Sequence, residues 1–352
     1  MARVLGLHSV ARRSIVPDMV RAWTLTDGDP DAETRCLGVA EAIADRVERR
    51  RVSPRAPWRW FAPLGPVDPL EAPDHAAGPI APRRGWPDVV IATGRQTPPY
   101  LASIRRASRS GVLTVFLGDS VLGARAADIV AVGEGSGVQG ANVIRTVAGP
   151  HRIDAIRLAA ARGGTAPGPE TDGPRVAVLL GGRRRRWSSE SGKRLAAGLS
   201  RLAGEGATLL ACARRDAGED LDLAVDGTVH YLWDRAGRDP QVALMAHADA
   251  IVVAGDDRLA LDEALSAGRA VFAFRPSGLS SAAAIHLDRL EGRGLVRPFA
   301  GRLEPCACAP VDAAGEIARA ITALSATRSA LKPRAERRAN LRKRETNGPT
   351  TR

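Results

Sequence analysis

The sequence has few of the residues and patterns that identify common classes of protein. Its 352 residues include 4 cysteines, and Cys306 and Cys308 are separated by one residue rather than by the two of a zinc or redox motif. We therefore expect structural or incidental thiols. No apolar run approaches the ~18 residues of a transmembrane helix, and Leu5–Val10 is interrupted too often to form the core of a secretory signal. A cytoplasmic location without a transmembrane segment is expected.

Signatures of known catalytic chemistry are also missing. The 6 histidines show no His-x-x-x-His or His-Glu pairing, which argues against metal-dependent hydrolysis. The absence of a Gly-x-Ser-x-Gly element argues against an α/β-hydrolase. His151 follows Gly149-Pro150 near the expected crossing between two domains, and this position alone makes it a candidate general base. We therefore assign no catalytic residue, metal or cofactor from the sequence.

Positive charge, in contrast, is abundant. The chain has 51 lysines and arginines against 39 aspartates and glutamates, a net charge of +12. Much of the excess lies in short arginine runs and in the polar segment after Lys332, which is expected to be disordered. No aromatic residue interleaves with the arginines of this tail, so it offers nothing for nucleic-acid bases to stack on. We expect at most weak, salt-sensitive polyanion binding by the tail, with peripheral contact at the inner membrane as a further interpretation.

The most informative stretch predicts a strand, a loop, a helix and a second strand. The apolar run Ala250–Ala254 leads into Gly255–Arg258, and a helical pattern then ends at Gly268 before the apolar run Val271–Phe274. Such a unit belongs to a parallel sheet that is covered on both faces. Because ligands of open α/β sheets bind at the carboxyl ends of the strands, the loop Gly255–Arg258 is the first place to expect one.

Two successive α/β halves are predicted along the chain. The first half has apolar strands at Ala22–Leu25, Asp88–Ala92 and Leu113–Leu117, and a helix that follows Asp27 and runs through Val47. The second half repeats this organisation after a stretch rich in glycine, proline and threonine. The fold class is therefore α/β, with two Rossmann-like lobes that face each other across a cleft.

The predicted division of the chain follows from these boundaries. It comprises a disordered or mis-called extension, an N-terminal domain, a linker, a C-terminal domain and a basic disordered tail, over residues 1–20, 21–160, 161–174, 175–327 and 328–352. Met19 is an alternative start of the chain. The last predicted helix, Val311–Leu324, is expected to cross back to the first lobe.

Residues at strand ends, or on the helix that follows, are the candidate ligand-binding set: Asp27, Gly28, Gly94, Arg95, Gly181, Gly182, Asp256 and Glu263. Glycines let the backbone approach a ligand, and a planar guanidinium suits a phosphate or carboxylate. Plainer interpretations remain open. Gly181-Gly182 matches neither a P-loop nor a dinucleotide fingerprint and is equally typical of a turn beside a solvated arginine run. Arg95 is equally a surface arginine, and Glu263, placed to bond a ribose or sugar hydroxyl, is equally a helix-surface charge.

Several segments in one order resemble the mitochondrial fission "elongated mitochondria" family in its bacterial branch, which is similar to two-domain GT-B glycosyltransferases. The matching pieces span roughly residues 22–300 and include Trp23–Gly28, Leu37–Ala42, Pro87–Arg95, Gly149–Arg152, Val176–Gly182 and Ala248–Phe274. The resemblance implies a GT-B-like fold. Where the family usually reads Thr-x-Asp-Ser, this chain has Ala254-Gly255-Asp256-Asp257, so a small and an acidic residue replace the two hydroxyl residues. The carboxylates of Asp256 and Asp257 repel a phosphate unless a metal or an arginine intervenes.

Two hypotheses about function follow. The first is a GT-B-like protein that binds a nucleotide-sugar or another phosphorylated small molecule, with glycosyl transfer as its activity. In GT-B proteins, arginines and helix N-termini can stabilise a diphosphate leaving group without a metal. The second is a catalytically silent scaffold of the same fold that binds protein partners. The plant fission factor of this family is an adaptor, although bacterial relatives do not share its mitochondrial context.

Overall fold

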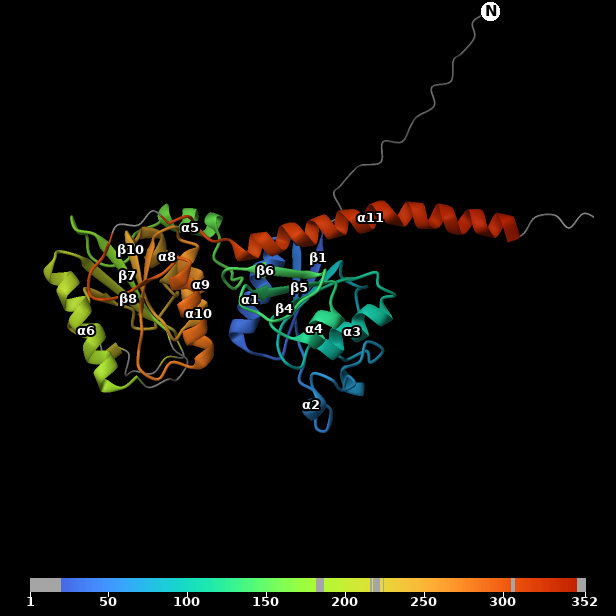
Figure 1. Ribbon diagram of the computed structural model, residues 1–352, viewed down its shortest axis with the longest axis horizontal. Coiled ribbons are helices and arrows are strands. Elements are labelled where there is room, and N and C mark those ends of the chain that lie inside the picture. Colours follow the sequence, from blue (N-terminus) through green and yellow to red (C-terminus); the bar gives the residue numbers. More distant parts are fainter. Residues whose placement is uncertain are drawn as a thin grey trace, which may run out of the picture.

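Two α/β domains lie side by side in the computed structural model (Figure 1). The structure describes residues 20–181, 187–215, 217, 222–223, 225–304 and 308–346, with backbone alone at 329 and 331–346. Each domain contains a parallel six-stranded sheet, and the strand orders are β2-β1-β3-β4-β5-β6 and β12-β11-β10-β7-β8-β9. The predicted fold class, two Rossmann-like lobes facing a cleft, is confirmed.

The first domain is built on a fully parallel sheet. Its strands are β1 (Arg21–Thr26), β2 (Arg46–Arg51), β3 (Val89–Ala92), β4 (Leu113–Leu117), β5 (Ile129–Gly133) and β6 (Val143–Thr146). Its helices are α1 (Pro30–Glu41), α2 (Trp58–Phe61), η1 (Pro69–Glu71), α3 (Pro98–Ala107) and α4 (Val121–Ala126). The central strands are apolar and buried because helices or loops cover both faces of the sheet.

The prediction of a helix running through Val47 is wrong at its end. Helix α1 ends at Glu41, and Arg46–Arg51 forms the edge strand β2 beside β1. The strand has the sequence Arg-Val-Glu-Arg-Arg-Arg and no fully buried residue. An edge strand in water does not need the apolar run by which a buried strand is recognised, so periodicity missed it.

The second domain repeats the architecture. Its strands are β7 (Arg175–Leu180), β8 (Thr208–Ala213), β9 (Tyr231–Leu232), β10 (Ala250–Ala254), β11 (Ala270–Phe274) and β12 (Arg297–Pro298). Its helices include α6 (Ser189–Gly204), α8 (Gln241–His247), α9 (Arg258–Leu265) and α10 (Ser281–Gly292). The unit β10-α9-β11 matches the strand, helix and strand expected from the sequence, and Gly268 with a φ of +64° follows the helix.

Helix α5 (Ala155–Arg162) packs with the second domain. The Arg162 Nε donates a hydrogen bond to the Ala246 carbonyl at 3.2 Å, and the His247 ring lies 3.0 Å from the Ala161 carbonyl. Ile153 and Leu158 are buried in the same apolar cluster as residues of β7 and β10. We infer that the chain enters the second domain before residue 155, upstream of the expected linker.

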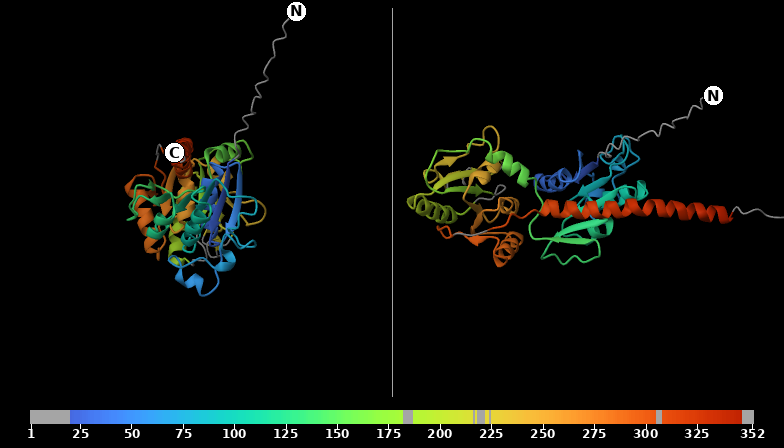
Figure 2. Two further views of the ribbon diagram at one scale, coloured as in Figure 1. Left: turned by 90° about the vertical axis from the view of Figure 1, so that its right-hand side faces the viewer. Right: turned by 90° about the horizontal axis from the view of Figure 1, so that it is seen from above.

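Helix α11 (Ala313–Thr346) returns to the first domain, as expected for the last helix (Figure 2). Its Ile317 and Ile321 are buried against the first sheet together with Val39, and Arg328 pairs with Asp128 at 2.5 Å. The helix continues past Leu324 to Thr346, so the tail expected to be disordered from residue 328 begins inside it. Alanine, leucine, arginine, lysine and glutamate, all good helix formers, dominate this extension.

Candidate functional site

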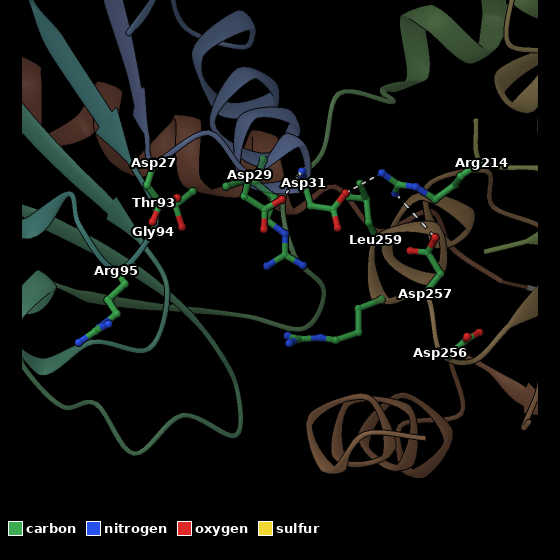
Figure 3. Close-up of a pocket in the computed structure, with 13 residues that line it drawn as sticks. Asp27, Asp29, Asp31, Thr93, Gly94, Arg95, Arg214, Asp256, Asp257 and Leu259 are labelled. Carbon is green, nitrogen blue, oxygen red and sulfur yellow. Dashed lines mark hydrogen bonds and ion pairs between the residues drawn. The ribbon is translucent and has the colours of Figure 1, made fainter. Parts of the chain in front are cut away.

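A cavity of about 480 Å³ lies between the two domains, at the carboxyl ends of strands from both sheets (Figure 3). The first domain lines it with the loops after β1 and β3 and with the start of α1, and the second with the ends of β8 and β10 and the start of α9. These are the strand ends where a ligand is expected in open α/β sheets. The lining residues are Asp27, Asp29, Asp31, Ala32, Arg35, Thr93, Gly94, Arg95, Arg214, Asp256, Asp257, Arg258 and Leu259.

Ion pairs connect the domains beside this cavity. The Arg214 guanidinium, at the end of β8, lies 2.8 Å from Asp31 of the first domain and 3.7 Å from Asp257 of the second (Figure 3). A second interdomain pair joins Arg293 to Glu134 at 2.7 Å. Salt bridges therefore join the two domains at the cavity, through Arg214, and at a second point, through Arg293.

The acidic loop that follows β10 is held by local bonds. Asp257 is the N-cap of α9, because its carboxylate accepts from the Ala260 N–H at 3.0 Å. Asp256 accepts from the Trp187 indole N–H at 3.1 Å. A Cβ on Gly181 would lie 2.1 Å from the Asp257 Cβ, so glycine is required for β7 to end this close to the loop. The repulsion expected between an acidic loop and a phosphate is offset at Asp257 by Arg214.

Three arginines meet where this cavity adjoins a second one of about 280 Å³. Arg35 and Arg258 line both cavities, and Arg289 lines the second. Within the described part of the chain, none of the three guanidinium groups makes a hydrogen bond or ion pair, and the Arg35 Nε is buried without a partner. Partial burial, and then the neighbouring charges of Arg35 and Arg289, lower the pKa of Arg258, while Asp262 and Asp119 act against this. A cluster of cations that repel one another is ready to bind an anion.

A buried histidine–carboxylate pair borders the second cavity. The Nε2 of His286, on α10, lies 2.9 Å from Oδ1 of Asp262, on α9, and both side chains are almost fully buried. The other carboxylate oxygen, Oδ2 of Asp262, is buried without a hydrogen-bond partner. An imidazole held by a carboxylate can accept or release a proton, so the cavity has an acid–base group on its second-domain side.

The candidate residues from the sequence separate into groups. Asp27, Gly94, Arg95 and Asp256 line the first cavity, and the exposed Arg95 extends away from Asp257 (Figure 3).

Four other candidates lie elsewhere. A Cβ on Gly28 would meet the Arg51 guanidinium at 2.2 Å, so Gly28 lies against a side chain rather than the cavity. Gly181 packs directly against the Asp257 side chain. Glu263 is buried and accepts from the Gln241 side-chain N–H at 2.6 Å. Gly182 lies outside the described residues.

The candidate base His151 lines neither cavity. It is buried, and its Nδ1 accepts from the Ile153 N–H at 3.2 Å. Burial lowers the pKa of His151, against the raising influence of Asp262. Sequence reasoning missed Arg35, Arg289 and the pair Asp262–His286. Single arginines on helices, and a histidine far along the chain from its carboxylate, carry no local signal.

Glu263 predicts a pH dependence of stability. Burial raises its pKa to about 8, although the hydrogen bond from Gln241 favours the charged form. Between the ordinary value of 4.5 and about 8, the folded state keeps a proton that the unfolded chain has released. The free energy of unfolding therefore falls as pH rises through this window, by up to ~1.4 kcal/mol per pH unit. Urea unfolding of Glu263→Gln is expected to show a flatter pH profile there, and an unchanged profile would contradict this assignment.

The fold and the site define a two-domain α/β protein that gathers arginines in the cleft between its domains. A family model described as Mitochondrial fission ELM1 matches residues 30–324. The chain belongs to this family, as its sequence resemblance indicated. None of the curated proteins matches it.

Solved structures of similar shape have low sequence identity. A UDP-GlcNAc 2-epimerase from Neisseria meningitidis bound to UDP-GlcNAc is 12% identical, with a TM-score of 0.47 over 87% of this chain and 99% of that one. MurG from Acinetobacter baumannii is 13% identical, with a TM-score of 0.46 over 79% and 85%. The glycosyltransferase SnogD from Streptomyces nogalater is 19% identical, with a TM-score of 0.45 over 89% and 99%. At these values the case for a function depends on this chain's own residues.

Among the helices of the described residues, none has the length and apolar content to cross a membrane.

Proposed function

We propose that this protein binds a nucleoside-diphosphate sugar, or a phosphorylated small molecule of similar chemistry, in the interdomain cleft, and that it transfers the glycosyl group. The observation that carries the proposal is the cluster of Arg35, Arg258 and Arg289, which has no anionic partner within hydrogen-bond distance among the described residues. Guanidinium groups recognise phosphate through paired hydrogen bonds, and the cluster supplies several of them.

The arrangement of the two cavities supports an elongated ligand with its charge near the middle. Arg35 and Arg258 lie at the junction, where they are placed to hold a diphosphate. The start of α9 faces the first cavity, and a helix N-terminus adds favourable potential for an anion. Beyond the junction, the first cavity presents carboxylates such as Asp27 and Asp29, which accept hydrogen bonds from ribose or sugar hydroxyls.

The pair Asp262–His286 supports transfer chemistry at the same place. It lies on the second cavity with Arg258 and Arg289, so a group bound there meets both a proton acceptor and cations that stabilise a departing diphosphate. His286 is the general base that we assign in this proposal, in place of His151.

The direct test compares ligands that differ in their phosphates. Isothermal titration calorimetry with UDP-, GDP- and ADP-sugars, the corresponding diphosphates and the uncharged nucleosides measures each affinity. At least one sugar nucleotide and its diphosphate are expected to bind, and its nucleoside at least about tenfold more weakly, because charge-assisted hydrogen bonds contribute ~1.5–3 kcal/mol each. If none of the ligands in the panel bound, this result would contradict the proposal and favour the scaffold hypothesis. Equal affinity for nucleoside and diphosphate would exclude the arginines as the phosphate site.

A further inference from the structure

The proline-rich segment between β2 and β3 exposes a group of large apolar side chains. Trp60, Phe61 and Leu64 are 67%, 57% and 78% exposed. Elsewhere in the described chain, exposed large apolar residues occur singly along the sequence. Helix α2, which carries Trp60 and Phe61, projects at the edge of the first domain (Figure 1). An apolar group this dense on a projecting segment indicates an interaction surface.

This segment is held in place rather than loose. The carboxylate of Asp68 is 1% exposed and accepts from the Arg55 guanidinium at 2.8 and 2.9 Å, and also from the backbone of Arg55 and Leu70. Glu71 accepts from the Ser53 N–H at 2.9 Å and from the Tyr100 hydroxyl. The segment therefore presents its apolar side chains without folding them back onto the domain.

Arginines that make no ion pair lie beside the apolar group. A groove of about 490 Å³ lies beside it, lined by Leu64, by prolines of both this segment and α3, and by Arg106 and Arg125. An adjoining hollow is lined by Arg105, Arg106 and Arg125. No carboxylate lines either space, and within the described residues these arginines make no ion pair. The surface combines projecting aromatic residues with arginines that make no ion pair among the described residues, although Asp74 lines a further hollow together with Arg106.

We propose that this surface, comprising Trp60, Phe61, Leu64, Arg106 and Arg125, docks the protein on a bilayer of anionic phospholipid. Aromatic side chains favour the boundary between headgroups and acyl chains, and arginines attract anionic headgroups. A projecting apolar segment beside cations fits the continuous, negatively charged surface of a bilayer. In the views of Figures 1 and 2, α2 and α11 lie on opposite sides of the first domain, so this surface acts apart from the basic C-terminal segment.

Vesicle co-sedimentation of the full chain tests the proposal. The vesicles contain either phosphatidylcholine alone or equal parts of phosphatidylcholine and phosphatidylglycerol. The wild-type protein is expected to sediment with the anionic vesicles and to remain in the supernatant with the neutral ones. The double variant Trp60→Ser/Phe61→Ser and the double variant Arg106→Ala/Arg125→Ala are each expected to bind at least about tenfold more weakly.

Matched controls distinguish this surface from an exposed apolar residue of the second domain and from the basic C-terminal segment. Ile156→Ser removes an apolar side chain that is 80% exposed on α5, and it is expected to bind as the wild type does. A chain that ends at Lys332 is expected to keep its binding. Circular dichroism establishes that each variant is folded. Wild-type binding by both double variants, loss of binding in the shortened chain alone, or no wild-type sedimentation with anionic vesicles would each overturn the proposal; the last would favour a protein partner for this surface.

Discussion

Replacing Arg258 with alanine is expected to weaken sugar-nucleotide binding by about 10- to 100-fold. Arg258 lines both cavities and makes no ion pair in the described part of the chain, so in our proposal its guanidinium is available to bind the diphosphate. Losing charge-assisted hydrogen bonds costs ~1.5–3 kcal/mol, which converts to this range. Arg35→Ala is also expected to weaken binding, because the Arg35 guanidinium lies at the same junction between the two cavities. Calorimetric titration with the best sugar nucleotide measures both.

Two variants sharpen this measurement. Arg258→Lys keeps the charge but loses the paired geometry, so its loss should be smaller than that of Arg258→Ala. Arg319→Ala removes an arginine that is 72% exposed on α11, away from the cleft, and should leave the affinity unchanged. Equal losses in Arg258→Ala and Arg319→Ala would mean that net charge, rather than a built site, governs binding.

Gly38→Ala is expected to destabilise the protein by about 1–3 kcal/mol, as overpacking in a close-packed interior does. Gly38 lies in α1, where a Cβ would fall 2.0 Å from the carbonyl oxygen of His151. His151 belongs to the segment that connects the domains, so the clash can be relieved only by moving backbone against backbone. This cost outweighs the gain of up to ~1 kcal/mol that alanine brings to a helix. Urea unfolding measures the change.

The control is a glycine with free space around it. Gly292 ends α10, and a Cβ there would meet no heavy atom within 4 Å. Gly292→Ala is therefore expected to be neutral or slightly stabilising. If Gly38→Ala were as stable as Gly292→Ala, the close contact between α1 and the connecting segment would not exist in solution.

Local sequence pattern was sufficient to predict the buried strands and the positions of several strand ends. Continuous apolar runs such as Ala250–Ala254 need no partner to be recognised, because strands covered on both faces must be apolar along their length. Glycine at 94, with a φ of +110°, marks a strand end that only glycine adopts readily. Parallel strands end at one sheet edge, so the same reasoning put Asp27 and Arg95 at strand ends, and both residues line the cavity.

Other structural features have no signal in the local sequence. The edge strand β2 is polar because water covers it, so it reads as the continuation of a helix. Glu263 follows the acidic loop by one helical turn, yet it turns inward to Gln241, since the face of a short helix that meets the sheet depends on packing. Asp262 and His286 meet although 24 residues separate them.

The sequence by itself determined the class of fold, its division into two similar halves, and the strand ends at which we expect a ligand. These follow from burial and backbone geometry, which act over a few residues. The tertiary structure alone decided which charges meet. Arg35 comes from one domain and Arg258 and Arg289 from the other, and Arg214 bridges both. Their juxtaposition depends on how the two sheets face each other. No local pattern in the chain encodes the distance between side chains of different domains.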